Sequence, residues 1–256
     1  MAFELSVALR PYYQDSSVQL YHGTWQQVFD RLPKLQADHL ITDPPYSAVT
    51  HRHFTGAASG DWRTSRGLDY GHLETEDIPV MLEAFASRVP GWLGCMCDAP
   101  LINAYTEGYL KLKRVQFAPV ACVLRGMNVR RSGDGPSNWT VYLMMSRTKA
   151  LHRWGVRPGA YVGSPRDKGM GRGPRIVVGM KPLWLMQTIL GDYTKSGQTV
   201  LDPFAGGCTT GIAARSMGRR AILIEAREEV CAAAALRLEA TADWPAPEFA
   251  MGGGSK

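Results

Sequence analysis

The sequence lacks any run of about 18 consecutive apolar residues, and its N-terminus lacks a charged segment followed by an apolar one. These absences argue against a membrane span and against an exported precursor. Cysteines number only five and form no C-x-x-C pair, so neither a disulfide framework nor a zinc site of paired thiolates is indicated. We therefore expect a soluble, cytoplasmic protein with free, buried thiols.

The length and composition predict one globular domain. The 256 residues include 45% hydrophobic ones, enough for a substantial core, and we find no internal repeat. We assign residues 1–250 to a single domain. The glycine-rich end, residues 251–256, is expected to be a flexible tail.

Positive charge is concentrated in one segment. Residues 125–175 contain eleven basic and two acidic residues, although the whole chain carries a net charge of only +6. Tryptophan and tyrosine are interleaved with these charges, a mixture that suits phosphate contact and base stacking. A solvated basic face is the alternative. The candidate nucleic-acid-binding residues here are Arg125, Arg130, Arg131, Arg153, Arg166 and Arg172.

A second unusual segment, residues 47–76, has no hydrophobic period and many small polar residues. Long loops in compact domains tend to be functional, so we expect a surface loop here, and Arg52 in it is a further candidate for contact with nucleic acid. The pair His51 and His53 has no nearby cysteine or carboxylate cluster, and we therefore predict no metal site.

Apolar periodicity predicts alternating strands and helices, the pattern of an α/β fold. We expect strands at 38–43, 92–99, 117–125, 140–147, 199–204 and 220–225, and helices at 77–89, 179–193, 212–218 and 228–240. The strand at 140–147 is strongly apolar and is expected to be central.

The C-terminal third predicts a nucleoside-binding unit. The glycines of "DPFAGGCTTG" follow a strand, and Glu225, at the end of the next strand, has the spacing of a ribose-binding carboxylate. The loop departs from G-x-G-x-x-G at Cys208. A dinucleotide and a nucleoside without a pyrophosphate are therefore both open as ligands.

The helix expected in "GMKPLWLMQTILGDY" begins near Pro182, with Lys181 beside it. Such a helix N-terminus suits a carboxylate group, because its N–H groups are free and its dipole is positive there. A plain amphipathic helix is the alternative.

The strand ending in "ITDPPY" closes with Asp43, Pro44, Pro45 and Tyr46. Prolines donate no hydrogen bond, so the Asp43 carboxylate and the Pro44 carbonyl form a rigid pair of acceptors. This pair matches the two hydrogens of an exocyclic amino group, and the tyrosine ring offers a face for a planar base. A turn that merely ends a strand is the alternative.

Taken together, "LYHGTW", "LITDPPY", "MKPLWLM" and "VLDPFAGGCTTGIAARSMGRRAILIE" resemble the amino-methylating DNA methyltransferases of the permuted β group, in that group's order. The resemblance implies a Rossmann-like, seven-stranded, mostly parallel sheet with helices on both faces and a circularly permuted topology. It also implies S-adenosylmethionine as cofactor and a flipped-out adenine or cytosine of double-stranded DNA as acceptor.

Carried over residue by residue, the resemblance makes Asp43, Pro44, Pro45 and Tyr46 catalytic. The cofactor-binding residues it implies are Gly23, Thr24, Asp43, Lys181, Pro182, Asp202, Phe204, Gly206, Gly207, Thr209, Thr210 and Glu225. Two positions depart from the family pattern: Thr24 stands where an aspartate is usual, and Cys208 where a second glycine is usual.

The first residue of the catalytic turn favours N6-adenine as the methylated position, because Asp there is mostly associated with adenine in the family. N4-cytosine is the alternative. Two further alternatives are a methyltransferase that acts on RNA or on a protein amide, and a DNA-binding relative without catalytic activity. Relatives of this kind are often homodimers, which leaves a second copy of the chain open as a partner.

Overall fold

The computed structural model describes residues 9–50, 71–126, 138–151, 154–164, 176–177 and 179–243. Most of the 47–76 loop, the tail 251–256 and much of the basic segment lie outside these residues. So do His51 and His53, and six of the seven arginines expected to bind DNA: Arg52, Arg130, Arg131, Arg153, Arg166 and Arg172.

The described residues form one ten-stranded sheet in the order β1-β2-β10-β9-β3-β4-β7-β6-β8, with β5 paired to β7. The strands are β1 (Tyr13–Gln14), β2 (Val18–His22), β3 (His39–Thr42), β4 (Trp92–Cys97), β5 (Val115–Gln116), β6 (Val120–Leu124), β7 (Thr140–Arg147), β8 (Ala160–Gly163), β9 (Thr199–Asp202) and β10 (Arg220–Glu225). The seven strands that were expected are β2, β10, β9, β3, β4, β7 and β6, in their order across the sheet. The short strands β1, β5 and β8 extend this sheet.

Strand direction defines where a site can form. Strands β2, β10, β9, β3 and β4 run parallel to one another, whereas β7 lies antiparallel between β4 and β6. The apolar strand β7 is thus an inner strand, as its sequence predicts. The carboxyl ends of the five parallel strands meet at one edge of the sheet.

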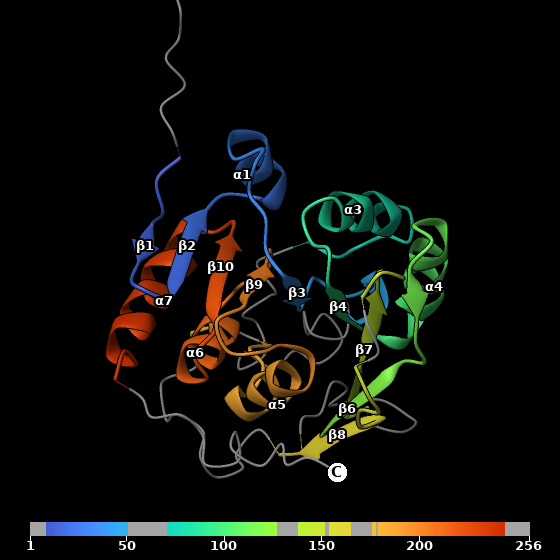
Figure 1. The fold of residues 1–256 in the computed structure, drawn as a ribbon. Coiled ribbons are helices and arrows are strands. Elements are labelled where there is room, and N and C mark those ends of the chain that lie inside the picture. Colours follow the sequence, from blue (N-terminus) through green and yellow to red (C-terminus); the bar gives the residue numbers. More distant parts are fainter. Residues whose placement is uncertain are drawn as a thin grey trace, which may run out of the picture.

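Helices cover both faces of the sheet, which confirms the predicted fold class (Figure 1). One face carries α1 (Trp25–Arg31), α3 (Asp77–Ala86) and α4 (Ile102–Lys111), and the other carries α5 (Leu183–Tyr193), α6 (Thr209–Ser216) and α7 (Glu228–Ala240). A short 3₁₀ helix, η1 (Ala99–Leu101), precedes α4. The sheet and its helices bury one hydrophobic cluster on each face.

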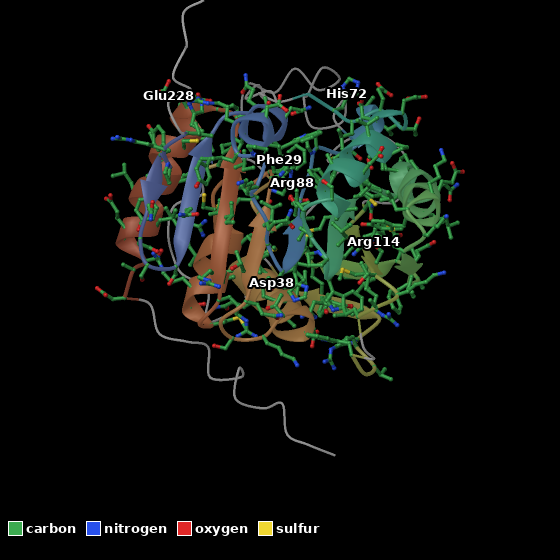
Figure 2. The ribbon with its side chains drawn as sticks, turned by 45° about the horizontal axis from the view of Figure 1, so that its top comes forward. Phe29, Asp38, His72, Arg88, Arg114 and Glu228 are labelled. Carbon is green, nitrogen blue, oxygen red and sulfur yellow. The ribbon has the colours of Figure 1, made fainter. Side chains whose placement is uncertain are left out.

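Arg88, just after α3, joins two elements of one face (Figure 2). Its guanidinium carbon lies 4.2 Å from the ring centroid of Phe29 in α1, a cation–π distance. The same guanidinium donates hydrogen bonds to the carbonyls of Phe29, Pro33 and Leu35. This contact fixes the chain between α1 and β3, and therefore the start of the strand that leads to Asp43.

The sequence-based boundaries are confirmed to within a few residues. Helix α3 ends at Ala86 rather than at residue 89, and α5 begins at Leu183 rather than at residue 179, because Pro182 has an extended backbone. Helix α6 begins at Thr209 rather than at residue 212, because the chain enters the helix directly from Cys208. All five cysteines are free and buried, as predicted. Among the described residues, no helix has both the length and the apolarity needed to cross a membrane.

Candidate active site

Four acidic residues stand at the carboxyl ends of parallel strands. Asp202 and Glu225 end β9 and β10, and Asp43 and Asp98 directly follow β3 and β4. Strands β9 and β3 are neighbours, but the chain leaves them towards helices on opposite faces of the sheet, α6 and α3. Such a switch point is where open α/β sheets bind ligands.

A cavity of about 740 Å³ opens at this edge. Its lining includes all four residues predicted to be catalytic and eleven of the twelve predicted to bind the cofactor, since Asp43 belongs to both sets. These are Asp43, Pro44, Pro45 and Tyr46, together with Gly23, Thr24, Lys181, Asp202, Phe204, Gly206, Gly207, Thr209, Thr210 and Glu225. Pro182 does not line the cavity and instead forms the N-cap of α5.

Asp43 is held by two partners. The Tyr46 hydroxyl donates a hydrogen bond to Asp43 Oδ1 at 2.8 Å, and Lys181 Nζ forms an ion pair with Asp43 Oδ2. Burial and then the charge of Asp43 raise the pKa of Tyr46 well above its ordinary value of 10.0, so the hydroxyl remains a donor. Lys181 Nζ also lies 5.1 Å from the Tyr46 ring centroid.

The Pro44 carbonyl is placed beyond the β-ladder. The pairing of β3 with β4 stops at Thr42, and among the described residues no backbone N–H outside the regular elements donates to the Pro44 oxygen. Because both Pro44 and Pro45 lack an N–H, these two residues present acceptors only. The arrangement can accept two hydrogen bonds from one amino group.

The glycine-rich turn approaches the cavity closely. Gly206 has φ +47°, a conformation that glycine adopts easily, and its N–H donates to Glu225 Oε2 at 3.0 Å. A Cβ on Gly207 would lie 2.4 Å from Met180 Sδ. The absence of a side chain at Gly207 therefore makes room for Met180, whereas a Cβ on Gly206 would meet no other atom within 4 Å.

Cys208, which departs from the family pattern, is a left-handed residue. It has φ 57° and ψ 30°, caps α6 and is completely buried. A non-glycine residue in this conformation costs roughly 1–2 kcal/mol, which explains the usual glycine. Arg237 of α7 lies behind the turn, where it donates to the Gly207 carbonyl and, at 3.1 Å, to Thr209 Oγ1.

Glu225 is oriented by its own turn. Its Oε1 accepts hydrogen bonds from Arg227 N at 3.0 Å and Arg227 Nε at 3.1 Å, and its carbonyl accepts from Gly23 N at 2.9 Å. Glu225 is 7% exposed, so the carboxylate is fixed at the cavity wall. The ribose contact of Glu225 stays a prediction.

Asp202 links β9, β3 and α6 beneath the cavity. Thr42 Oγ1 and the Phe204 N–H donate to its Oδ1 at 2.6 and 3.1 Å, and Thr210 Oγ1 donates to Oδ2 at 2.6 Å. Burial raises the pKa of Asp202 to about 6 despite these hydrogen bonds. Asp202 and Thr210 thus form part of the cavity lining where β9 and α6 meet.

Thr24, the other departure from the family pattern, has a structural task. It is the N-cap of α1 and forms a capping box with Gln27: Thr24 Oγ1 accepts from Gln27 N, and Gln27 Oε1 accepts from Thr24 N at 2.9 Å. Gly23 before it has φ 139°, which favours glycine. Both residues line the cavity beside Trp25.

Asp98 lies beside the catalytic turn but was not predicted from the sequence. This buried carboxylate accepts hydrogen bonds from Ser47 Oγ at 2.5 Å and Thr50 Oγ1 at 2.6 Å, and so holds the chain that follows the catalytic turn. The signal was present, because "WLGCMCD" repeats the pattern of "HLITD" and "TVLD", an apolar strand followed by or ending in an acid.

Of the residues predicted to contact DNA, Arg125 alone is described, and it is exposed just after β6. Among the described residues, no three His, Cys, Asp or Glu side chains cluster as metal ligands would.

Comparison with known proteins relates the chain to the N6/N4 DNA methyltransferases. Residues 173–236 match the family N6_N4_Mtase, described as DNA methylase. The Type II methyltransferase M2.DpnII of Streptococcus pneumoniae is 24% identical and covers 90% of this chain and 93% of its own.

Two solved structures are similar in fold. The M1.HpyAVI–SAM complex has a TM-score of 0.61 at 20% identity, covering 86% of this chain and 99% of its own. The PvuII DNA methyltransferase, named as cytosine-N4-specific, has a TM-score of 0.64 at 16% identity, covering 89% and 88%. The two solved structures support the Rossmann-like methyltransferase fold.

Proposed function

We propose that this chain, a relative of the N6/N4 DNA methyltransferases, methylates the exocyclic amino group of a base in double-stranded DNA with S-adenosylmethionine as cofactor. One observation carries the proposal. A single cavity joins the glycine-rich turn and Glu225 to the acceptors of Asp43 and Pro44, so a nucleoside cofactor and an amino group can meet there.

The cavity wall fits the cofactor. Glu225 presents a fixed carboxylate for ribose hydroxyls, and Gly206 and Gly207 leave the turn without side chains. The N-terminus of α5, which has no side-chain cap, and the adjacent Lys181 suit a carboxylate group. When bound, S-adenosylmethionine supplies an electrophilic methyl group.

Asp43 and Pro44 then activate the acceptor. An exocyclic amine is a poor nucleophile, because its lone pair is delocalised into the ring. Hydrogen bonds from both amine hydrogens to Asp43 and the Pro44 carbonyl favour a pyramidal nitrogen with a free lone pair. As the N–C bond formed and the S–C bond of the sulfonium broke, the nitrogen would gain positive charge and uncharged S-adenosylhomocysteine would be released. Asp43 would stabilise the charge on the nitrogen until a proton passed to water. Tyr46 provides the stacking face for the target base after it has been flipped out of the DNA double helix.

We assign DNA contact to the basic segment and the 47–76 loop. The arginines at 52, 125, 130, 131, 153, 166 and 172 would bind phosphates, and their positive charge is the support for this assignment. A single domain over residues 1–250, the permuted β-group topology and a homodimer remain predictions.

We propose N6 of adenine as the methylated position. The support is Asp43, since a carboxylate is a strong acceptor for the amine, and a purine stacks more extensively on Tyr46 than a pyrimidine does. N4 of cytosine is the second candidate, favoured by the fold similarity to PvuII DNA methyltransferase.

The test is nucleoside mass spectrometry of mixed-sequence genomic DNA from an unmethylated host after incubation with the protein and S-adenosylmethionine. N6-methyladenine is expected with the wild type and not with Asp43→Ala, which should still bind cofactor. N4-methylcytosine alone would overturn the choice of base. Methylation of RNA instead of DNA, or DNA retention without transfer, would overturn the function itself.

A further inference from the structure

The Tyr46 hydroxyl and the Lys181 ammonium give each oxygen of the catalytic carboxylate a donor. Asp43 Oδ1 accepts from Tyr46, and Oδ2 accepts from Lys181. An incoming amino group would therefore share an Asp43 oxygen with a donor already bound there, whereas neither of these donors bonds to the Pro44 carbonyl. An ammonium beside the amine would also oppose the positive charge that the nitrogen gains during transfer. The observed pairing suits a resting site better than a reacting one.

Lys181 is placed to exchange partners. Its side chain is 6% exposed, so the ammonium needs an anionic partner within the protein. The preceding residue, Met180, packs against Gly207 of the glycine-rich turn, so Lys181 lies between that turn and Asp43. Its backbone adjoins the uncapped N-terminus of α5, where a second carboxylate would also be stabilised.

We propose that the carboxylate of the cofactor's methionine part and Asp43 compete for Lys181, so that cofactor binding frees Asp43 Oδ2 for the target amine. This inference rests on the proposed function and goes beyond it, because it makes cofactor occupancy a condition for holding the base. Lys181 is then a positioning residue, which acts through Asp43.

Competition predicts opposite effects of the two partners. Asp43→Asn removes the competing charge, so S-adenosylhomocysteine should bind more tightly than to the wild type, by about fivefold or more. Lys181→Met removes the shared cation and should weaken that binding by a similar factor. S-Adenosylhomocysteine is chosen because its sulfur is uncharged. Its affinity therefore contains no contribution from a direct attraction between Asp43 and a sulfonium.

The control ligand is 5′-methylthioadenosine, which has the nucleoside but no carboxylate. Its affinity, measured by the same calorimetry, should be unchanged in both variants, and this also shows that they are folded. Lys111→Met, at the exposed end of α4, is the matched control for loss of a lysine and should change neither affinity.

The outcomes separate the two proposals. If the wild type binds neither ligand, the proposed function fails. If it binds both but Asp43→Asn leaves S-adenosylhomocysteine affinity unchanged or weaker, the exchange of Lys181 is wrong and the ion pair is a fixed part of the site. Equal changes for both ligands would also overturn the exchange.

Discussion

Asp98 and Ser47 join the end of β4 to the residue that follows the catalytic turn. The Asp98 carboxylate accepts both the N–H and the hydroxyl of Ser47, the latter at 2.5 Å. Near the other end of the 47–76 loop, Leu73 N donates a hydrogen bond to the Tyr46 carbonyl at 3.0 Å. Both ends of the 47–76 loop are thereby fastened beside Tyr46, so loop position and catalytic geometry are linked.

Asp98→Ala should lower methyl transfer to DNA while leaving cofactor affinity intact. The substitution removes the acceptor for Ser47 and Thr50, and a small displacement of Tyr46 should cost about tenfold or more in rate. Transfer kinetics and calorimetry with S-adenosylhomocysteine measure the two quantities. Asp30→Ala, on the exposed side of α1, should change neither. A parallel loss of cofactor affinity would show that Asp98 supports the whole cavity instead.

Gly207→Ala should weaken cofactor binding by roughly tenfold, because the new methyl group would displace Met180 and with it the glycine-rich turn. The double variant with Met180→Ala should recover part of the affinity, since the obstructing Sδ is gone. Gly191→Ala in α5 is the matched control, because a Cβ there makes only an ordinary contact of 3.4 Å with Met217. No recovery in the double variant would contradict the steric explanation.

Much of the site could be predicted from sequence because its residues are local to strand ends. An apolar run followed by Asp43, or ending in Asp202 or Glu225, identifies a strand and its carboxyl end together. Parallel pairing then brings these ends to one edge without further information. The same reasoning would have found Asp98.

The rest depends on contacts that no short pattern encodes. Lys181 and Asp43 are 138 residues apart in sequence, and their ion pair follows from how α5 packs against the sheet. The start of α6 was misplaced because Cys208 adopts a left-handed conformation that its residue type does not favour. The capping task of Thr24 likewise required the observed geometry with Gln27.

DNA affinity should fall steeply with salt, and the basic segment should account for part of that slope. Replacing Arg130 and Arg131 together with Glu should reduce the log–log slope by about two, because each lost phosphate contact removes nearly one released counterion. The measurement is fluorescence anisotropy with mixed-sequence duplex DNA over a series of salt concentrations. Lys34→Glu with Lys111→Glu, exposed residues outside the segment, keeps the total charge change equal. Equal slopes for the two double variants would show that the basic segment is only a solvated face and does not contact DNA phosphates.

Asp202 should make the protein less stable as the pH rises. Burial raises its pKa from 3.8 to about 6, so the folded state favours the protonated acid. The stabilising contribution is therefore fully present below pH 3.8 and is lost as the pH rises through about 6. At 1.36 kcal/mol per pKa unit, the loss amounts to up to about 3 kcal/mol in the free energy of unfolding.

The measurement must isolate Asp202 from a group with the opposite sign. Burial lowers the pKa of His39 below 6.5, so His39 makes the protein less stable as the pH falls. We therefore compare denaturant unfolding of the wild type and of Asp202→Asn at each pH, because the His39 contribution cancels in the difference. The wild type should lose stability relative to the variant between pH 4 and 7. A difference for Asp202→Asn that is flat, or that rises with pH, would mean that the three hydrogen bonds to Asp202 outweigh its burial.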